Sequence, residues 1–367
     1  MHHYYHTTLL KKRKTTHLLC APEERAKLSA TIASLLTPAD HTMLPAGYRP
    51  RIGLPADLIW DQRKWPFVGA HAACVLAIEQ AGGEVCPFHV RMLDQKEDPF
   101  LVLWRAIRQY DGLCLSGSWG DIDPRLYGET PHPQTELPEA WLHWWMIHLA
   151  LFATILRVPL LAICGGMQAW NVALGGRLLQ DLRGRVHVRH LARRATPERW
   201  AIHPITVLPH TRLSFYLDNE GSVLSVPSAH NQAVDILIHG GSRLYTTPGL
   251  HGTDLDLPRL QVSARSPDQL VAALEIAPSA REERLLSDFA LGFQDHLEWS
   301  DASWAATLFR RFVQAAADYA VRRESTSADQ WEALREPLRS ALEGVRRLLA
   351  LRTASRAQGG TYAASLR

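Results

Sequence analysis

Short apolar runs alternate with helix-like patterns along the chain from about residue 51 onward. We expect a strand where four to six apolar or β-branched residues stand between turn formers, and a helix where apolar positions recur every three or four residues. This alternation predicts an α/β fold in which helices flank a mostly parallel central sheet. The expected strands are 51–54, 84–88, 112–116 and 159–163, and the expected helices are 69–80, 100–109 and 138–156.

The run from Pro159 to Ile163 is apolar throughout, as expected of a central parallel strand that is buried on both faces. The longer apolar stretch 141–163 is interrupted by two histidines, an arginine and a proline, which argues against a membrane span. We therefore expect a buried helix followed by a core strand, and no membrane partner.

From residue 200 onward the pattern changes to short runs with frequent Pro, Gly and His, including apolar runs at 260–264 and 271–276. These runs predict antiparallel ribbons added to the parallel sheet. The stretch 239–258 is rich in Gly, Thr and Asp and predicts a surface loop long enough to act as a lid.

The last part of the chain is helical in pattern, first over 302–322 and then, after a polar break, over 331–349. The second segment repeats apolar residues at spacings of three and four, which indicates an amphipathic helix packed on the domain. A homodimer contact is the alternative interpretation of the same face. We expect one large domain over 48–320, with extensions over 1–47 and 321–367.

The composition is that of a globular protein, with 367 residues of which 46% are hydrophobic and 21% charged. Both ends are basic: residues 1–47 carry six Lys or Arg against three Asp or Glu, and residues 321–367 carry nine against five. The middle of the chain is therefore net negative, and we expect no nucleic-acid partner. Solvated helix faces account for the basic ends.

Five cysteines are scattered without a C-x-x-C pair, so we expect neither a disulfide framework nor a zinc site. A reducing, cytoplasmic location is the better expectation, and the start of the chain lacks a secretory signal. We assign no cofactor and no metal ligand, and the histidines near the start receive no metal role.

Cys164 lies where the apolar strand 159–163 gives way to a helical pattern, and Gly165 and Gly166 follow it directly. A nucleophile elbow needs this arrangement, because only small neighbours leave the side chain exposed at the end of the strand. The helix amino terminus favours a thiolate, and the Gly165 N–H faces a developing oxyanion. Cys74, Cys86 and Cys114 sit inside apolar patterns and are expected in the core.

The segment ICGGMQAWNVALGGRLLQDL resembles the nucleophile segment of the peptidase C26 branch of class I glutamine amidotransferases, whose pattern is I-C-R-G-M-Q-x-x-N-V-x-x-G-G-x-L-x-Q-D. Three further motifs follow the family order, and the likeness spans about residues 50–320. The resemblance implies a cysteine hydrolase in which Cys164 attacks the amide of a small γ-glutamyl substrate like γ-glutamyl-γ-aminobutyrate, as in polyamine catabolism.

The segment ALGFQDHLEWS resembles the family's L-G-V-Q-W-H-P-E-W, and this resemblance makes His296 the base and Glu298 its orienting acid. The two residues are two positions apart in the sequence, so on an extended segment both side chains leave the same face. Three positions depart from the family: Asp295 stands for Trp, Leu297 for Pro and Gly165 for Arg. We expect Asp295 to add a carboxylate near the His296 imidazole and to raise its pKa.

Two other segments complete the resemblance. DGLCLSGSWGDIDPRLYGE resembles the loop that supplies the second oxyanion donor, which implies backbone N–H groups at Gly117 and Ser118. SAHNQAVD resembles the family's S-x-H-x-Q-A-V-D, which implies that Ser228, His230 and Gln232 line the substrate. The alternative is that the last two only satisfy backbone groups. Gln168 is implied as a contact for the glutamyl α-carboxylate or α-amine.

Three functions fit these residues. The leading hypothesis is hydrolysis of a γ-glutamyl amide through a thioester on Cys164. The second is a glutaminase subunit that uses the same triad and delivers ammonia to a separate synthase, because no synthase domain fits in the remaining residues. The third, motivated by the altered residues around His296, is a catalytically silent binding protein.

Overall fold

The computed structural model describes most of the chain between residues 44 and 339. The described ranges are 44–60, 66–69, 71–88, 98–117, 120–136, 140–184, 201–218, 223–236, 238–240, 243–247, 257–278 and 289–336, with single residues at 186, 188, 190, 338 and 339. All structural statements below concern these residues.

Five adjacent strands of the central sheet run parallel, in the spatial order β4, β1, β5, β6 and β15. The last three are buried along their whole length, as strands covered by helices on both faces should be. The strands are β1 (Arg51–Pro55), β4 (Glu84–Phe88), β5 (Gly112–Leu115), β6 (Leu160–Ile163) and β15 (Ala290–Phe293).

Antiparallel strands extend the sheet beyond β15 in the order β14, β13, β12 and β11, and a β8–β9 pair branches from β13. The α/β fold with added antiparallel ribbons that the sequence predicts is confirmed. These strands are β8 (Ala201–Val207), β9 (Val223–Ser228), β11 (Ile238–Gly240), β12 (Arg243–Tyr245), β13 (Leu260–Arg265) and β14 (Val271–Ile276).

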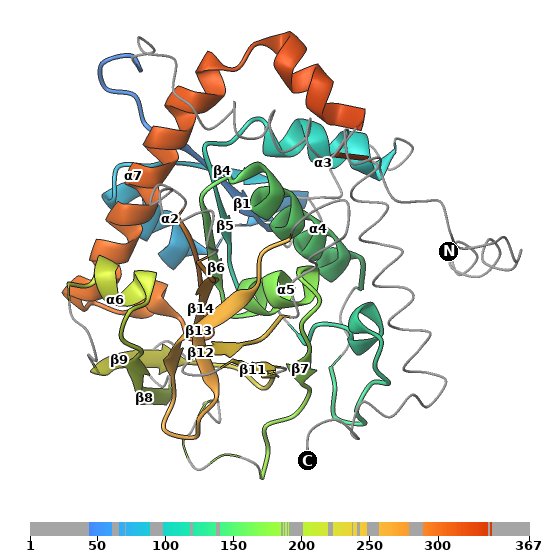
Figure 1. The fold of residues 1–367 in the computed structure, drawn as a ribbon, viewed down its shortest axis with the longest axis vertical. Helices are drawn as coiled ribbons and strands as arrows, with labels where there is room; N and C mark the ends of the chain where they lie inside the picture. Colours follow the sequence, from blue (N-terminus) through green and yellow to red (C-terminus); the bar gives the residue numbers. More distant parts are fainter. Residues whose placement is uncertain are drawn as a thin grey trace, which may run out of the picture.

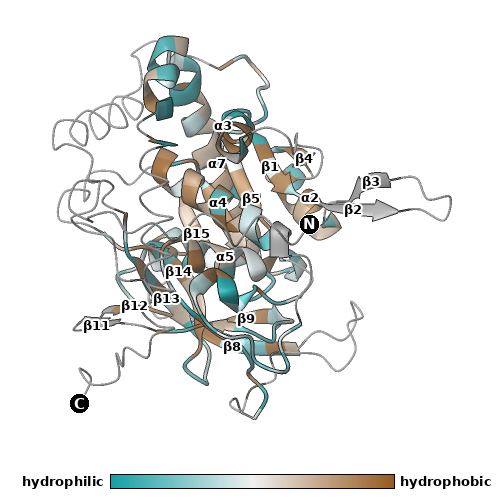
Figure 2. Ribbon diagram, turned by 90° about the vertical axis from the view of Figure 1, so that its right-hand side faces the viewer, coloured by the Kyte–Doolittle hydropathy of each residue, from teal (hydrophilic) through white to brown (hydrophobic). Residues whose placement is uncertain are grey.

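Helices cover both faces of the sheet (Figure 1). On one face α2 (Ala72–Gln80) packs against α7 (Ser303–Ser325), and their apolar side chains form one core cluster with the strands. On the other face α3 (Pro99–Ile107), α4 (Ala140–Leu156) and α5 (Gly165–Ala173) form the second cluster. The inner strands β1 and β5 are coloured mainly as hydrophobic in Figure 2, consistent with this two-sided covering.

Several short elements complete the described fold. Two small antiparallel pairs, β2 with β3 and β7 with β10, lie outside the central sheet. The elements are β2 (Asp57–Trp60), β3 (Pro66–Gly69), β7 (Leu178–Leu179), β10 (Ala233–Val234), helix α6 (Arg212–Tyr216), and 3₁₀ turns at Pro124–Tyr127 and Leu297–Trp299.

Two expected elements differ from the structure. The loop expected over 239–258 is wrong in its first part, because β11 and β12 pair there as an antiparallel ribbon; residues 241–242 and 248–256 lie outside the described residues. The helix expected from residue 69 begins at Ala72, because Pro66–Gly69 pairs with β2 instead.

The C-terminal helical segment packs on the domain over its described part. Trp331, Leu334 and Leu338 are at most 5% exposed and belong to the core cluster that contains α3 and α4. This half of the apolar face is therefore covered by the chain itself rather than free for a dimer. Helix α7 runs through the expected domain boundary at residue 320 without a break, and the later apolar positions 342, 345 and 349 lie outside the described residues.

Within the described part of the chain, we find no helix with the length and apolar character that crossing a membrane requires.

Candidate active site

Three loops meet at the carboxyl ends of adjacent parallel strands. Leu115 of β5 pairs with Ala162 of β6, and Ile163 of β6 pairs with Phe293 of β15, so these three strands end side by side. Gly117, Cys164 and the segment 294–296 follow directly. Because sites in open α/β sheets form beyond the carboxyl ends of the strands, this edge is the candidate active site.

Cys164 stands in a strained turn between β6 and α5. Its backbone has φ 51° and ψ −112°, a conformation that residues other than glycine rarely adopt. Its N–H donates to the carbonyl of Phe293 at 2.7 Å, which fixes it to β15. A methyl group on Gly166 would collide with the carbonyl oxygen of Leu115, so α5 approaches β5 this closely only because the residue is glycine.

His296 is held between Cys164 and Glu298. A side-chain hydrogen bond joins its ring to the Cys164 thiol, and its Nδ1 lies 2.7 Å from Oε1 of Glu298. The segment is not extended as the sequence analysis assumes, because Leu297–Trp299 forms a 3₁₀ turn. The turn still places the Glu298 carboxylate beside the His296 imidazole, so the expected contact forms although the backbone is a 3₁₀ turn and not an extended segment.

The surroundings of His296 favour its protonated form. Burial alone lowers its pKa, but the charges of Glu298 and Cys164, with a hydrogen bond from each, raise the pKa to about 10. An imidazolium beside the sulfur stabilises a thiolate. Trp299 stacks on the ring, with centroids 3.6 Å apart and planes 10° from parallel, and so restricts its orientation.

Of the expected oxyanion residues, Gly117 lies beside Cys164 and His296, and Gly165 directly follows Cys164. A methyl group on Gly117 would lie 3.5 Å from Cβ of Cys164 and 3.1 Å from Cε1 of His296, so glycine keeps the space above the sulfur open. Gly165 is the first residue of α5. Ser118 lies outside the described residues.

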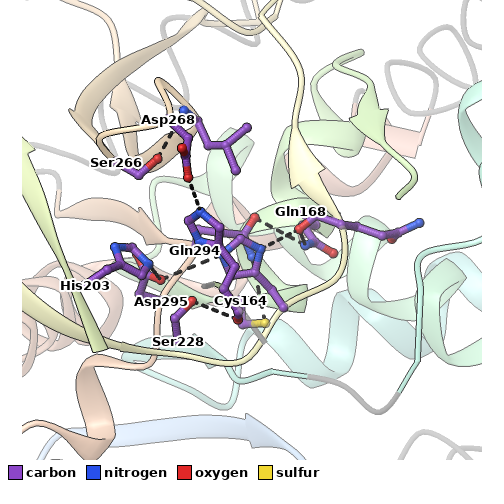
Figure 3. Close-up of polar contacts among 12 residues, drawn as sticks. Cys164, Gln168, His203, Ser228, Ser266, Asp268, Gln294 and Asp295 are labelled. Atoms are coloured by element: carbon purple, nitrogen blue, oxygen red, sulfur yellow. Dashed lines mark hydrogen bonds and ion pairs between the residues drawn. The ribbon is translucent and has the colours of Figure 1, made fainter. Parts of the chain in front are cut away.

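Gln294 is a residue of this site to which the sequence pattern gave no role. Its Nε2 donates to Sγ of Cys164 at 3.9 Å, and its Oε1 accepts from Nε2 of Gln168 at 3.2 Å. Its presence in the G-x-Q-x-H-x-E-W frame was the signal that a role existed. Figure 3 shows Gln294 between Gln168 on one side and the His203–Asp295 pair on the other.

Gln168 and the 228–232 segment are tied into the protein. Gln168 is buried, and its Nε2 also donates to the Gln232 carbonyl at 3.0 Å. The Gln232 side-chain carbonyl accepts from the Ile122 N–H at 2.9 Å, whereas its buried Nε2 has no partner in the described part of the structure. The hydroxyl of Ser228 donates to the His190 carbonyl. Among Gln168, Ser228 and Gln232, the groups that remain for a ligand are therefore the side-chain nitrogen of Gln232 and the side-chain carbonyl of Gln168.

The expectation for Asp295 is wrong. Its carboxylate is 3.1 Å from Nε2 of His203 and 3.8 Å from Nε2 of His230, and the carboxylate that raises the pKa of His296 is that of Glu298. Adjacent residues direct their side chains apart, so Asp295 enters a separate buried group of histidines that includes His190. His230 therefore belongs to this group rather than facing the sulfur.

Comparison with known proteins places this geometry in a family. A model of the peptidase C26 family matches residues 50–298, which is more than half of the chain and includes Cys164, His296 and Glu298. The chain belongs to the peptidase C26 family. It is a hydrolase of the class I glutamine amidotransferase superfamily, and this confirms the resemblance drawn from the sequence motifs.

Two relatives of this C26 chain are named after different activities. It is 32% identical over 220 residues to a γ-glutamyl-γ-aminobutyrate hydrolase of Escherichia coli O157:H7, covering 58% of this chain and 75% of that one. It is 31% identical over 283 residues to a putative glutamine amidotransferase of Mycobacterium tuberculosis, covering 75% and 77%. Among solved structures, the glutaminase domain of Trypanosoma brucei CTPS with bound acivicin has 14% identity and a TM-score of 0.47, covering 73% of this chain and 94% of that one.

Proposed function

We propose that this chain hydrolyses the γ-glutamyl amide bond of a small γ-glutamyl compound, with Cys164 as nucleophile, His296 as base and Glu298 as orienting acid. The observation that carries the proposal is the contact chain from a strained cysteine at a strand end to His296 and on to Glu298. Nucleophile, base and orienter within hydrogen-bond reach are the mark of covalent acyl transfer.

The first half of the reaction forms a thioester. Glu298 accepts from Nδ1 of His296, so the other ring nitrogen faces the thiol and takes its proton. The thiolate sulfur attacks the amide carbonyl carbon, and the carbonyl oxygen becomes an oxyanion that accepts from the Gly165 N–H. Collapse breaks the C–N bond, and His296 returns the proton to the departing amine.

The second half releases glutamate. Water replaces the amine, His296 takes a proton from it, and the resulting hydroxide attacks the thioester carbonyl. The C–S bond breaks, the sulfur recovers its proton from His296, and the new γ-carboxylic acid leaves and loses its own proton to water. Because Trp299 stacks on the ring, His296 keeps one orientation in both halves.

The substrate class follows from the relatives rather than from geometry. Several similar proteins are named γ-glutamyl-γ-aminobutyrate hydrolases, so we propose that compound or a related amide of a short amine as the substrate. The expected ligand contacts are the amide ends of Gln168 and Gln232, which lie buried next to Gln294.

The test is a screen of γ-glutamyl amides with mass-spectrometric detection of glutamate and of the released amine. Purified chain alone should cleave γ-glutamyl-γ-aminobutyrate or a close analogue, and Cys164→Ala should reduce the rate to the background. A rate near wild type in Cys164→Ala, with an unchanged far-UV spectrum, would contradict the proposal.

A second function is favoured by the relative named a putative glutamine amidotransferase, which matches 75% of this chain. In that case the same residues act on glutamine and release ammonia to a separate synthase. Slow turnover of glutamine by the isolated chain, accelerated by a co-purifying partner and without cleavage of the amide panel, would select this function.

A further inference from the structure

We propose a binding site for one divalent transition-metal ion of the zinc type, separate from the Cys164 site, with four ligands: His190, His203, His230 and Asp295. One ligand atom from each residue lies within 4.8 Å of every other, and all four residues are buried. Three imidazoles and one carboxylate are a ligand set that zinc accepts in tetrahedral sites. The four residues come from separate segments of the chain, so sequence spacing alone predicts no such site.

Hydrogen bonds fix which nitrogen of each imidazole carries its proton. His190 Nε2 lies 3.1 Å from a carboxylate oxygen of Asp268, which only accepts, so this nitrogen is the donor. His203 Nδ1 faces the carbonyl oxygen of Pro204 at 3.0 Å, and His230 Nδ1 faces that of Gln232 at 2.8 Å. In each ring one nitrogen is therefore a donor to an outer acceptor.

The other nitrogen of each ring is left for the interior of the group. Those of His203 and His230 face the same oxygen of Asp295, at 3.1 Å and 3.8 Å. Nδ1 of His190 is buried and makes no hydrogen bond in the described structure, and its ring lies 4.5 Å and 4.8 Å by centroids from His203 and His230. Three ring nitrogens and one carboxylate oxygen thus converge in one buried place.

A cation is needed to offset this convergence. One proton satisfies the His203–Asp295 pair and leaves the buried Nδ1 of His190 without a partner in the described structure, and such a group is costly to bury. A single divalent ion satisfies all four ligand atoms at once. Outer acceptors that fix the tautomer and orientation of ligating histidines are the usual second layer of metal sites, and here each histidine has one.

The group is closed and linked to the catalytic segment. Asp268 lies in the β13–β14 turn and also accepts from the Val188 N–H at 2.9 Å, while the His230 N–H donates to the His190 carbonyl at 3.0 Å. Asp295 immediately precedes His296. Four protein ligands leave no open position for substrate, so the ion acts as a structural tie that holds His190, β8, the loop after β9 and the base-bearing loop together.

The first experiment measures metal content in the full chain. Protein purified without a metal-affinity column and equilibrated with zinc should retain about one equivalent after desalting, as expected for a closed four-ligand site. Replacement by Co²⁺ should give the visible absorption of a four-coordinate ion, and a chelator should remove it and lower the melting temperature. Retention below about a tenth of an equivalent would overturn the proposal.

Variants assign the ion to this site. His203→Gln and His230→Gln should lose the retained ion, and Asp268→Asn, which alters only an outer acceptor, should weaken binding by about 10- to 100-fold. His143→Gln is the matched control, because His143 is an equally buried histidine on α4 outside the group. It should keep the ion.

Cys164→Ala separates the metal site from the proposed reaction, since it should abolish turnover and keep full metal content. The histidines near the chain start remain in every variant. If His203→Gln retained as much metal as wild type, or if Cys164→Ala lost it, the ion would be bound elsewhere and the proposal would be wrong.

Discussion

At the scale of single residues, the site depends on close approaches that only glycine permits and on one strained cysteine. Cys164 has a positive φ, which costs an ordinary residue about 1–2 kcal/mol and persists only where neighbours enforce it. The enforcing contacts are the bond from its N–H to Phe293 and the packing of Gly166 on Leu115.

We predict that Gly166→Ala destabilises the fold and moves the nucleophile. The added methyl group must push α5 away from β5, so the free energy of unfolding should fall by about 1–3 kcal/mol or more, measured by urea titration. Gly184→Ala is the comparison, because its methyl group meets no atom within 4 Å and only its positive φ is strained. An equal loss in both variants would show that the α5–β5 contact contributes nothing.

We predict that Glu298→Gln lowers kcat by up to about 10⁴-fold with little change in KM. The amide can donate to Nδ1 of His296 and so stabilise the wrong tautomer, as in other triads that lose their acid. Steady-state kinetics on the best γ-glutamyl amide measure the effect. Glu332→Gln, an exposed glutamate on the C-terminal helix, should leave kcat unchanged. A kcat near wild type in Glu298→Gln would remove this residue from the mechanism.

At the scale of elements, the sequence pattern predicted the parallel core well, because β5 and β6 are apolar and buried along their whole length and α4 is a long apolar stretch that is almost entirely buried. The β11–β12 ribbon was missed because Gly, Thr and Asp dominate its surroundings and its strands have only three residues each. The motifs in the sequence also identified Cys164, His296 and Glu298 as candidate catalytic residues. It could not reveal the side-chain direction of Asp295, which depends on the contacts of strands far apart in the chain.

We predict that Trp331→Ala destabilises the protein by about 3–5 kcal/mol, although Trp331 lies beyond the matched family region. Its ring packs edge-on against Trp104 of α3, with centroids 5.8 Å apart, and Arg108 covers it. Thermal and urea unfolding measure the loss. Glu332→Ala changes the adjacent exposed residue and should stay within about 0.5 kcal/mol of wild type.

At the scale of the whole molecule, Asp111 joins three distant parts of the chain. Its buried carboxylate accepts from the Tyr48 hydroxyl at 2.6 Å, from the Arg51 N–H at 2.7 Å and from Arg323 Nε of α7 at 3.0 Å. The side chain of Asp111 is fully buried. A substitution that removes this carboxylate would therefore take the acceptor away from all three donors at once.

We therefore predict that Asp111→Ala lowers the free energy of unfolding by about 3–5 kcal/mol, because the partly buried Arg323 guanidinium loses its buried charge partner and keeps only the exposed carboxylate of Glu324. Equilibrium urea unfolding gives the value. Asp318→Ala, an exposed aspartate on the same α7 helix, should change it by less than about 0.5 kcal/mol. Similar values for both variants would mean that the Asp111 contacts are not stabilising.

The position of β15 has a consequence for synthesis of the protein. This strand is inserted between β6 and β14, although more than a hundred residues separate it from β6 in the sequence. While the chain leaves the ribosome, the edge of β6 stays unpaired and open to association with other strands until residue 293 has emerged. Cys164 and His296 therefore meet only when nearly the whole domain has been made. Until then, the Cys164 thiol of the nascent chain lacks the imidazole that would activate it.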